Sequence, residues 1–385
     1  MSTILTRMNG IRKAPIIDLL AQVSIPNDVI SFGQGIPFFK PPKDAINSVK
    51  EALLTPKSFQ YTPDSGRLDL RQVIAEKIYA EQGVNINPEK QIIVTSGANQ
   101  AFMNVILALT NPGDEILFFS PTYFNYVMAA ELAGCKPIFL NTDENYQPLH
   151  DKIEEKISKK TKAIVTVSPN NPTGAVYYPE ILRKINSLCR DYSLYHISDE
   201  VYEYFVYENA VHKSPLCYDT SQSHTISLFS LSKSFALSGL RVGYSIFPEY
   251  LYEDMLKVQD TISICAPSLS QYAALRSIPL GKQYCSQFFD VLLNNRSLVK
   301  SILSDLEGVN VITTKGAYYF FILLDSNRSS IDIAKELIEM FGIIVLPGIF
   351  FDEKRCSFRM SYGNLITEKF EEGLHRLKTG LSKVM

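Results

Sequence analysis

SLFSLSKSFALSGLRVG, residues 227–243, sets a single lysine, Lys233, among serines and small apolar residues, and the next cation along the chain is Arg241. The preceding run, TISLFSLS (225–232), is apolar and β-rich, which predicts a buried strand that ends just before Lys233. In open parallel sheets, ligands bind beyond the carboxyl ends of the strands. Most lysines are solvated surface residues, so a functional role for Lys233 depends on what surrounds it.

Similar apolar runs alternate with helical periodicity from about residue 45 to 280, a pattern typical of βαβ units around a buried sheet. Five further strands are predicted within QIIVTSG (91–97), DEILFFSP (114–121), TKAIVTVSP (161–169), LYHISDE (194–200) and RVGYSIF (241–247). The clearest helix lies within 65–83, where Ser65 is expected to cap the start and Gly83 to end it. We therefore expect a large α/β domain over residues 45–280, with a mixed, mostly parallel sheet flanked by helices.

After about residue 285 the pattern becomes that of a smaller α+β domain. NVITTKGAYYFFILLD (310–325) predicts a hairpin, residues 330–341 a helix, and CSFRMSY (356–362) a strand, and a last helix is expected to begin near Thr367. The irregular first 44 residues are too short for a domain of their own. We expect residues 1–44 and 281–385 to form the small domain together.

The overall charge bears on the class of partner. The chain of 385 residues carries 38 lysines and arginines against 40 aspartates and glutamates without a basic stripe, which argues against nucleic acid or an anionic membrane and leaves small molecules. Six scattered cysteines without a CxxC pair and five dispersed histidines indicate neither a disulfide framework nor a metal site. The sequence lacks a signal-peptide pattern and an apolar run long enough to span a bilayer, so we expect a cytoplasmic protein.

Polar residues follow several predicted strands at the edge where a ligand is expected. The small-residue turn SGAN (96–99) leads into a helix whose free amides suit a phosphate. SPNNPTG (168–174) follows another strand as a rigid turn that presents amide side chains. Asp199 ends a third strand, as either the cap of the next helix or a functional carboxylate.

The residues around Lys233 meet the requirements of pyridoxal phosphate. Its amine can form a Schiff base with the aldehyde, while hydroxyls and a guanidinium can bind the phosphate. The phosphate ligands expected on this ground are Ser230, Ser232 and Arg241. A carboxylate must keep the ring nitrogen protonated so that the ring accepts electrons, and Asp199 suits this role. Asn171 and Tyr202 are expected to donate hydrogen bonds to the phenolic oxygen, and Tyr123 is expected to stack on the ring face.

Eight motifs in a fixed order make the chain resemble a known family over nearly its whole length. They are GQGIP (33–37), YTPDSGRLDLR (61–71), TSGANQA (95–101), SPTY (120–123), SPNNPTG (168–174), SDEVYE (198–203), SLSKSFALSGLRVG (230–243) and FRMSYG (358–363). The family is that of the class I/II aminotransferases, fold-type I pyridoxal-phosphate-dependent enzymes.

The resemblance implies an enzyme that moves the α-amino group of an amino acid to a 2-oxo acid through a Schiff base at Lys233. It implies a homodimer with composite active sites, in which Tyr61 reaches the cofactor phosphate of the second subunit. The implied catalytic residues are Lys233, Asp199 and Tyr202. The cofactor contacts include these three and Gly97, Ala98, Asn99, Tyr123, Asn171, Ser230, Ser232 and Arg241. The substrate contacts are Arg359, as the bidentate partner of the α-carboxylate, and Asn171, Gly35 and Ile36.

Two other activities stay open at this point. The family also contains carbon–sulfur lyases, aminocyclopropane-carboxylate synthases and cyclases of arginine-derived amino acids, which share the cofactor residues, so elimination or cyclisation is the alternative reaction. A regulator that only senses a ligand would carry an added DNA-binding domain, and no helix-turn-helix pattern precedes residue 30.

The sequence also bears on the substrate. Asn99 stands where some dicarboxylate-specific members of the family carry a lysine, and TISICAP (261–267) contains no arginine for a distal carboxylate. Aspartate and glutamate are therefore not expected as preferred donors. The aromatic residues expected near the entrance suit an aromatic or long side chain, unless they pack between the domains; they are Phe38, Phe39, Tyr318 and Tyr319.

Overall fold

The computed structural model describes residues 7–385, and a seven-stranded sheet with the order β2-β8-β7-β6-β5-β3-β4 lies at its centre. Neighbouring strands run parallel from β7 to β4, whereas β8 is antiparallel to both β2 and β7. The strands are β2 (Ile92–Thr95), β3 (Glu115–Ser120), β4 (Lys136–Asn141), β5 (Thr161–Val167), β6 (Tyr195–Asp199), β7 (Thr225–Ser230) and β8 (Gly243–Ile246). The prediction of a mixed, mostly parallel sheet is confirmed.

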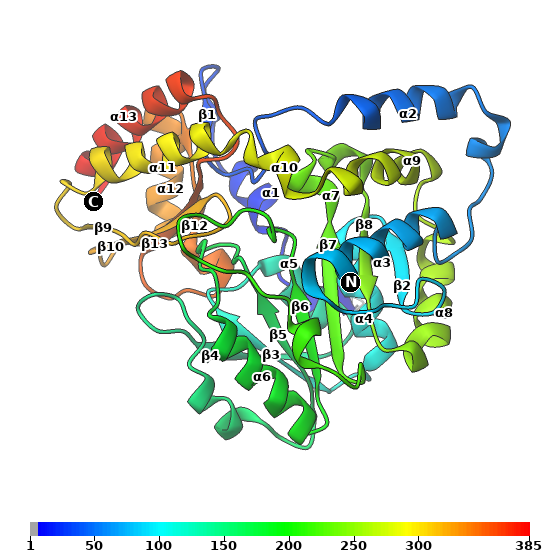
Figure 1. Cartoon of the computed structure of the whole chain (residues 1–385). Helices are drawn as coiled ribbons and strands as arrows, with labels where there is room; N and C mark the ends of the chain where they lie inside the picture. Colours follow the sequence, from blue (N-terminus) through cyan, green and yellow to red (C-terminus); the bar gives the residue numbers. More distant parts are fainter. Residues whose placement is uncertain (1–6) are drawn as a thin grey trace, which may run out of the picture.

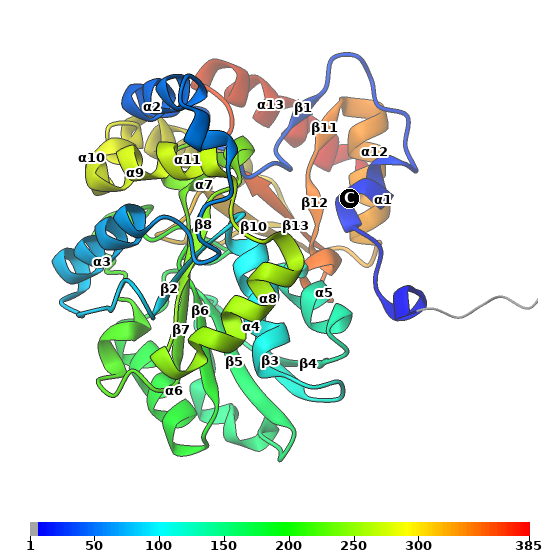
Figure 2. The same ribbon diagram turned by 90° about the vertical axis from the view of Figure 1, so that its right-hand side faces the viewer.

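Helices cover both faces of this sheet because its central strands are apolar on both sides. One face packs against α4 (Ala98–Leu109), α5 (Phe124–Leu132) and α8 (Tyr252–Ser263). The other packs against α3 (Leu68–Gln82) and α6 (Pro179–Asp191). Figure 2 shows these two groups of helices on opposite sides of the strands.

A second sheet, antiparallel and four-stranded, has the order β12-β13-β10-β9 and lies at the upper left of Figure 1. Its strands are β9 (Val309–Val311), β10 (Tyr319–Leu324), β12 (Leu346–Pro347) and β13 (Ser357–Ser361), and helices α11 (Phe289–Leu303), α12 (Ser330–Phe341) and α13 (Thr367–Val384) accompany it. The predicted hairpin, strand and two later helices are all present.

The N-terminal segment reaches both parts of the fold. Strand β1 (Ile30–Ser31) pairs in parallel with β11 (Ile343–Ile344), beside the second sheet, and α2 (Lys43–Leu53) packs on α9 (Ser268–Ser277). The short helices α1 (Pro15–Leu20), α7 (Leu231–Ser234) and α10 (Gly281–Ser286) complete the set. Residues 32–42 therefore connect β1, beside the second sheet, with α2, which packs on α9.

Three local predictions were wrong or incomplete. Ser65 does not cap α3, which begins at Leu68 without a side-chain cap; the carbonyl of Ser65 instead accepts a hydrogen bond from the amide of Val94 in β2 (3.0 Å). Asp199 caps no α-helix, since a turn follows β6. Strand β4, at one edge of the sheet, was not predicted; five of its six side chains are at least partly exposed, so it lacks a continuous apolar run. Gly83 does end α3, with a φ of 70°.

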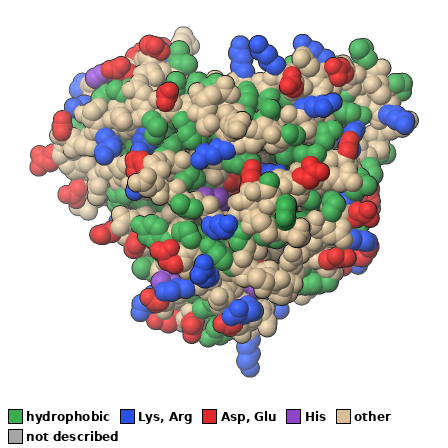
Figure 3. All heavy atoms as spheres, viewed as in Figure 1, with side chains coloured by type: hydrophobic (Ala, Val, Ile, Leu, Met, Phe, Trp, Pro, Cys, Tyr) green, Lys and Arg blue, Asp and Glu red, His purple; other side chains and the backbone are tan. Residues whose placement is uncertain are grey.

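Charges of both signs are interspersed on the face of the molecule that Figure 3 shows, without a continuous basic patch. None of the helices within residues 7–385 is long and apolar enough to cross a membrane.

Candidate active site

A cavity of about 440 Å³ lies at the carboxyl ends of β5, β6 and β7, facing residues of the second sheet. This volume is within the range of small-molecule sites. The expected site residues that line it are Gly35, Ile36, Ala98, Asn99, Tyr123, Asn171, Asp199, Tyr202, Ser230, Ser232, Lys233, Arg241 and Arg359. The fold thus brings together side chains that are more than 300 residues apart in the sequence.

One end of the cavity is built to bind an anion. The guanidinium of Arg241 lies 3.4 Å from the hydroxyl of Ser232, which accepts a hydrogen bond from Ser230 (3.0 Å). The amino end of α4 begins at Ala98, directly after Gly97, and its free amides favour a negative charge. Gly97 has a φ of 84°, and a Cβ there would collide with the guanidinium of Arg241. Only glycine leaves room for this arrangement.

The amine of Lys233 projects into the cavity from α7. Its Nζ donates a hydrogen bond to the carbonyl oxygen of Gly35 (2.6 Å), in the segment that follows β1. Burial, with the positive charges of Arg359 and Arg241 added to it, lowers the pKa of Lys233 to about 8. A larger fraction of this amine is therefore uncharged near neutral pH than of an ordinary lysine.

The carboxylate of Asp199 is only 4 % exposed and is held by two donors. The hydroxyl of Tyr126 donates to one oxygen (2.9 Å) and the amide of Val201 to the other (3.0 Å). Burial raises the pKa of Asp199 to about 6, although both donors oppose this rise. Sequence reasoning missed Tyr126; the available signal was its position in SPTYFNY, three residues after Tyr123 and thus on the same side of a helix.

Aromatic hydroxyls surround the middle of the cavity. The hydroxyls of Tyr202 and Tyr319 are 2.5 Å apart, and the ring of Tyr123 meets that of Tyr126 edge to face, at 5.2 Å between centroids. Of the four aromatic residues expected at the entrance, only Tyr319 lines the cavity. Phe38 and Phe39 instead pack on Phe288, which is the alternative that the sequence left open.

Arg359, on β13, forms the end of the cavity nearest the second sheet. Its guanidinium donates to Oδ1 of Asn171 (2.7 Å) and to the carbonyl of Gly33 (2.5 Å). It is 4 % exposed, yet its Nε has no hydrogen-bond partner within residues 7–385. Because Arg359 lines the cavity and a planar guanidinium can bind a carboxylate through two parallel hydrogen bonds, this residue is suited to a carboxylate ligand.

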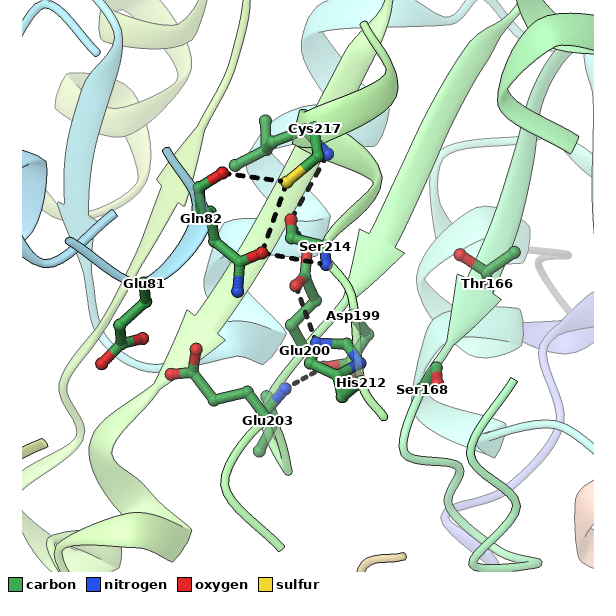
Figure 4. A network of polar contacts seen from close by, with 12 residues as sticks. Glu81, Gln82, Thr166, Ser168, Asp199, Glu200, Glu203, His212, Ser214 and Cys217 are labelled. Carbon is green, nitrogen blue, oxygen red and sulfur yellow. Dashed lines mark hydrogen bonds and ion pairs between the residues drawn. The ribbon is translucent and has the colours of Figure 1, made fainter. Parts of the chain in front are cut away.

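Next to Asp199 in the chain, Glu200 belongs to a second polar group, drawn in Figure 4, whose residues do not line the cavity. The carboxylate of Glu200 accepts hydrogen bonds from Ser214 (2.9 Å) and from Nε2 of His212 (3.0 Å). All three side chains are buried, and successive residues at a strand end face opposite sides of the sheet. This group fixes the backbone next to Asp199 from the side opposite to the ligand.

Two expected cofactor residues, Gly97 and Tyr61, do not line the cavity. Gly97 nevertheless lies beside Arg241. Tyr61 belongs to the segment that joins α2 and α3, which runs along the right-hand side of Figure 1, and it is 78 % exposed. A single chain therefore does not bring Tyr61 to its own site.

The donor set fits pyridoxal phosphate. An anion site, a buried carboxylate and an amine of lowered pKa surround one cavity, and the buried side chain of Arg359 lines its other end. These are the groups that this cofactor and an amino-acid carboxylate require. The cavity thus has the chemical parts that the sequence predicted.

The comparisons with known proteins agree with this geometry. Residues 27–377 match the family model of aminotransferase class I and II. An aromatic aminotransferase of Arabidopsis thaliana is 32 % identical over 97 % of this chain and 94 % of its own. An aspartate aminotransferase of Pyrococcus abyssi is 33 % identical over 91 % of both chains.

A solved structure supports the same assignment. An aromatic aminotransferase from Pyrococcus horikoshii superposes with a TM-score of 0.88 at 32 % identity, over 96 % of this chain and all of the other. The fold is accordingly that of a fold-type I pyridoxal-phosphate-dependent transferase. The chain belongs to the class I and II aminotransferases, pyridoxal-phosphate-dependent enzymes that move the amino group of an amino acid to a 2-oxo acid.

Proposed function

We propose that this aminotransferase prefers amino donors with an aromatic or long apolar side chain. The observation that carries this proposal is the lining of the cavity: its only cations within residues 7–385 are Lys233, Arg241 and Arg359. Each is assigned a role toward cofactor or α-carboxylate in this proposal, so none of the cations that one chain supplies remains for a second carboxylate on the substrate. Apolar groups of Ile16, Ile36 and Phe124 line it as well. Similar proteins named for both aromatic and aspartate substrates exist, and this lining favours the aromatic class.

The cavity residues are assigned roles within the same proposal. Pyridoxal phosphate, when bound, supplies the aldehyde that takes up the amino group and the ring that withdraws electrons from the α-carbon. Lys233 holds the aldehyde end and, once displaced by substrate, moves the α-proton with its Nζ. Asp199 pairs with the ring nitrogen, and Tyr202 and Asn171 donate to the phenolic oxygen. Arg359 orients the substrate by its α-carboxylate.

The other proposed contacts complete the cofactor and substrate sites. The phosphate is assigned to Ser230, Ser232, Arg241 and the turn of Gly97, Ala98 and Asn99. Tyr123 covers the ring face, and Gly35 and Ile36 lie beside the substrate. The anion site and its free helix amides support the first of these assignments.

The proposal includes a cytoplasmic homodimer with composite sites. The exposed apolar side chains of Leu54, Phe59 and Tyr61 gather on one segment, which supports an interface there and would bring Tyr61 to the partner's phosphate site. All six cysteines are free, which fits a reducing compartment. Residues 45–280 are assigned to the large domain, and 281–385 with 7–44 to the small one, while residues 1–6 of the expected small domain lie outside the described residues; each of the two main sheets falls within one of these units.

A comparison of donors tests the proposed substrate class. With a saturating 2-oxo acid, we expect kcat/KM for phenylalanine or tyrosine to exceed that for aspartate by about tenfold or more, because a distal carboxylate would be buried without a partner. Asn99→Lys is the matched variant, since it adds a cation to the lining and should raise kcat/KM for aspartate. A wild-type preference for aspartate would refute the proposal. Turnover without any 2-oxo acid would indicate elimination or cyclisation instead.

Tyr126→Phe tests how Asp199 is kept ionised. Asp199 loses its charge as the pH falls through its pKa of about 6, and the Tyr126 hydroxyl opposes protonation. Without this donor the pKa of Asp199 should rise, so that affinity for pyridoxal phosphate declines at a pH about one unit higher than in the wild type. The affinity is measured between pH 5 and 8. Tyr195→Phe, whose hydroxyl lies 3.0 Å from that of Tyr250 on the surface, is the control and should leave the profile unchanged.

A further inference from the structure

A buried ammonium lies beneath the cavity, in no contact with it. Lys77, on α3, has a side chain only 7 % exposed, and its Nζ donates to both carboxylate oxygens of Glu203, at 2.8 and 2.6 Å. The hydroxyl of Tyr244 is 3.2 Å away and the carboxylate of Glu81 is 3.4 Å away. Nothing in the proposed reaction uses this cation, yet burying it is costly unless its partners are well placed.

The ammonium contacts three separate elements of the large sheet. Besides Glu203, which lies in the turn after β6, it sits 4.6 Å from the ring centroid of Phe229 on β7. Phe229 in turn stacks on Tyr244 of β8, with centroids 4.9 Å apart and an interplanar angle of 18°. Lys77 therefore connects the turn after β6 with β7 and β8 through one charged group.

Each of these three elements carries a residue of the anion and cofactor site or begins directly beside one. Phe229 directly precedes Ser230, and because strand side chains alternate, the two face opposite sides of the sheet. Tyr244 directly follows Gly243, which is paired with Ser230 in the sheet. Arg241 lies two residues before Gly243. A shift of either strand would thus alter the spacing between the serines and the guanidinium.

The turn after β6 likewise carries one side chain toward the cavity and another toward Lys77. The amide of Glu203 bonds to the carbonyl of Glu200 (2.9 Å) and that of Phe205 to Tyr202 (2.8 Å), so the turn is closed by its own backbone. Tyr202 lines the cavity, whereas Glu203 bonds to Lys77. In Figure 4 the carboxylates of Glu203 and Glu81 lie close together, on the side of the turn away from Glu200 and its partners.

We propose that Lys77 is a positioning residue: by pairing with Glu203 against Phe229, it fixes the strand ends that place the cofactor-binding residues around the cavity. This inference rests on the site residues assigned under the proposed function. Lys77 touches neither cofactor nor substrate and acts only through the three elements that it connects.

The charge of Lys77 is maintained in this environment. Burial is the largest single influence and opposes a positive charge, but Glu203, Tyr244, Tyr204 and Glu81 together outweigh it, so the pKa of Lys77 lies well above its ordinary value. The groups that face the ammonium are those of α3, the turn after β6, β7 and β8 already named. A neutral side chain of similar length, such as methionine, removes the charge and keeps most of the volume.

The test compares stability with cofactor geometry in Lys77→Met, Glu203→Gln and the double variant. Lys77→Met alone leaves Glu203 buried without a counter-ion and should lower Tm. The double variant removes both charges and should regain most of this loss, because a buried pair contributes little net stability. Its dissociation constant for pyridoxal phosphate should nevertheless be raised about tenfold. The circular dichroism induced in the visible band of the cofactor should also change, because it reports ring orientation.

Two controls separate a positioning role from a structural one. Arg296→Met removes another buried cation, on α11 beside the second sheet, which pairs with Glu208 in the segment after β6; it should lower Tm and leave cofactor affinity and dichroism unchanged. Lys77→Arg keeps the charge and should restore affinity to within about threefold of the wild type. If the double variant does not fold, Glu203→Gln alone is measured, with the same direction expected.

The inference is overturned if the double variant, or Glu203→Gln in its place, binds pyridoxal phosphate with wild-type affinity and dichroism. That result would leave the proposed function intact. Failure of the wild-type protein itself to bind the cofactor would instead refute the site assignment on which the inference rests. The two failures are therefore distinguishable in one titration series.

Discussion

Lys233→Ala is expected to lower kcat by about 10⁴-fold and to leave the fold intact. The side chain makes one hydrogen bond, to the carbonyl of Gly35, so its loss costs little stability, whereas no other amine lines the cavity within residues 7–385. The proton of the substrate α-carbon then has no base positioned to take it. Activity is measured with the best donor of the panel, and Tm is measured alongside. Lys90→Ala, on the surface, is the matched control.

The pH dependence of the same lysine gives an independent measurement. Because the pKa of Lys233 is lowered to about 8, its uncharged form predominates above that pH and is lost as the pH falls below it. In the cofactor-free protein, capture of pyridoxal at this residue, trapped by borohydride, should therefore rise with pH and level off above about 8. If the capture of pyridoxal levels off only near pH 10.5, or if Lys233→Ala keeps full activity, the role assigned to Lys233 is contradicted.

Arg359→Ala is expected to raise KM for the amino donor by about 10²-fold, with a smaller effect on kcat. The guanidinium is buried, is held by Asn171 and Gly33 and lines the cavity, so without it a substrate carboxylate would lose the one cation that residues 7–385 fix at this end of the cavity. A split of this kind, larger in KM than in kcat, is the signature of binding rather than of chemistry.

Arg359→Lys is the informative partner of this variant. Lysine keeps a charge but not the planar fork, so KM should fall between the values for arginine and alanine. Removal of the guanidinium also removes a positive charge near Lys233, and the pKa of Lys233 should rise accordingly. An unchanged KM in Arg359→Ala would refute the proposed role.

The parts of the fold that the sequence predicted are those governed by short-range rules. Buried parallel strands are apolar on both faces, so β5, β6 and β7 stand out from their flanks, and Lys233 is conspicuous at the end of such a strand. Strand β4 was missed because it lies at the sheet edge, where only one of its side chains is fully buried. Ser65 was misassigned because its position before α3 resembles a cap, while its carbonyl pairs with β2.

The contacts that the sequence did not reveal join residues that are far apart in the chain. Tyr126 and Asp199 are separated by 73 positions, and Lys77 and Glu203 by 126. Tyrosines, lysines and glutamates are common on helices and turns, so neither pair produces a local pattern. Only the packing of α3 and α5 against opposite faces of the sheet determines which of these side chains meet.

Gly97 has a consequence for how this sequence can vary. It supplies no side-chain atom to the cavity, yet its backbone, with φ 84° and ψ 172°, is a conformation that other residues adopt only with strain, and a Cβ there would also displace the guanidinium of Arg241. Substitutions at position 97 are therefore disfavoured, even though the residue takes no part in the chemistry. What Gly97 contributes is the space left by its missing side chain, which the guanidinium of Arg241 occupies beside the start of α4. A glycine at a neighbouring position would not leave this space.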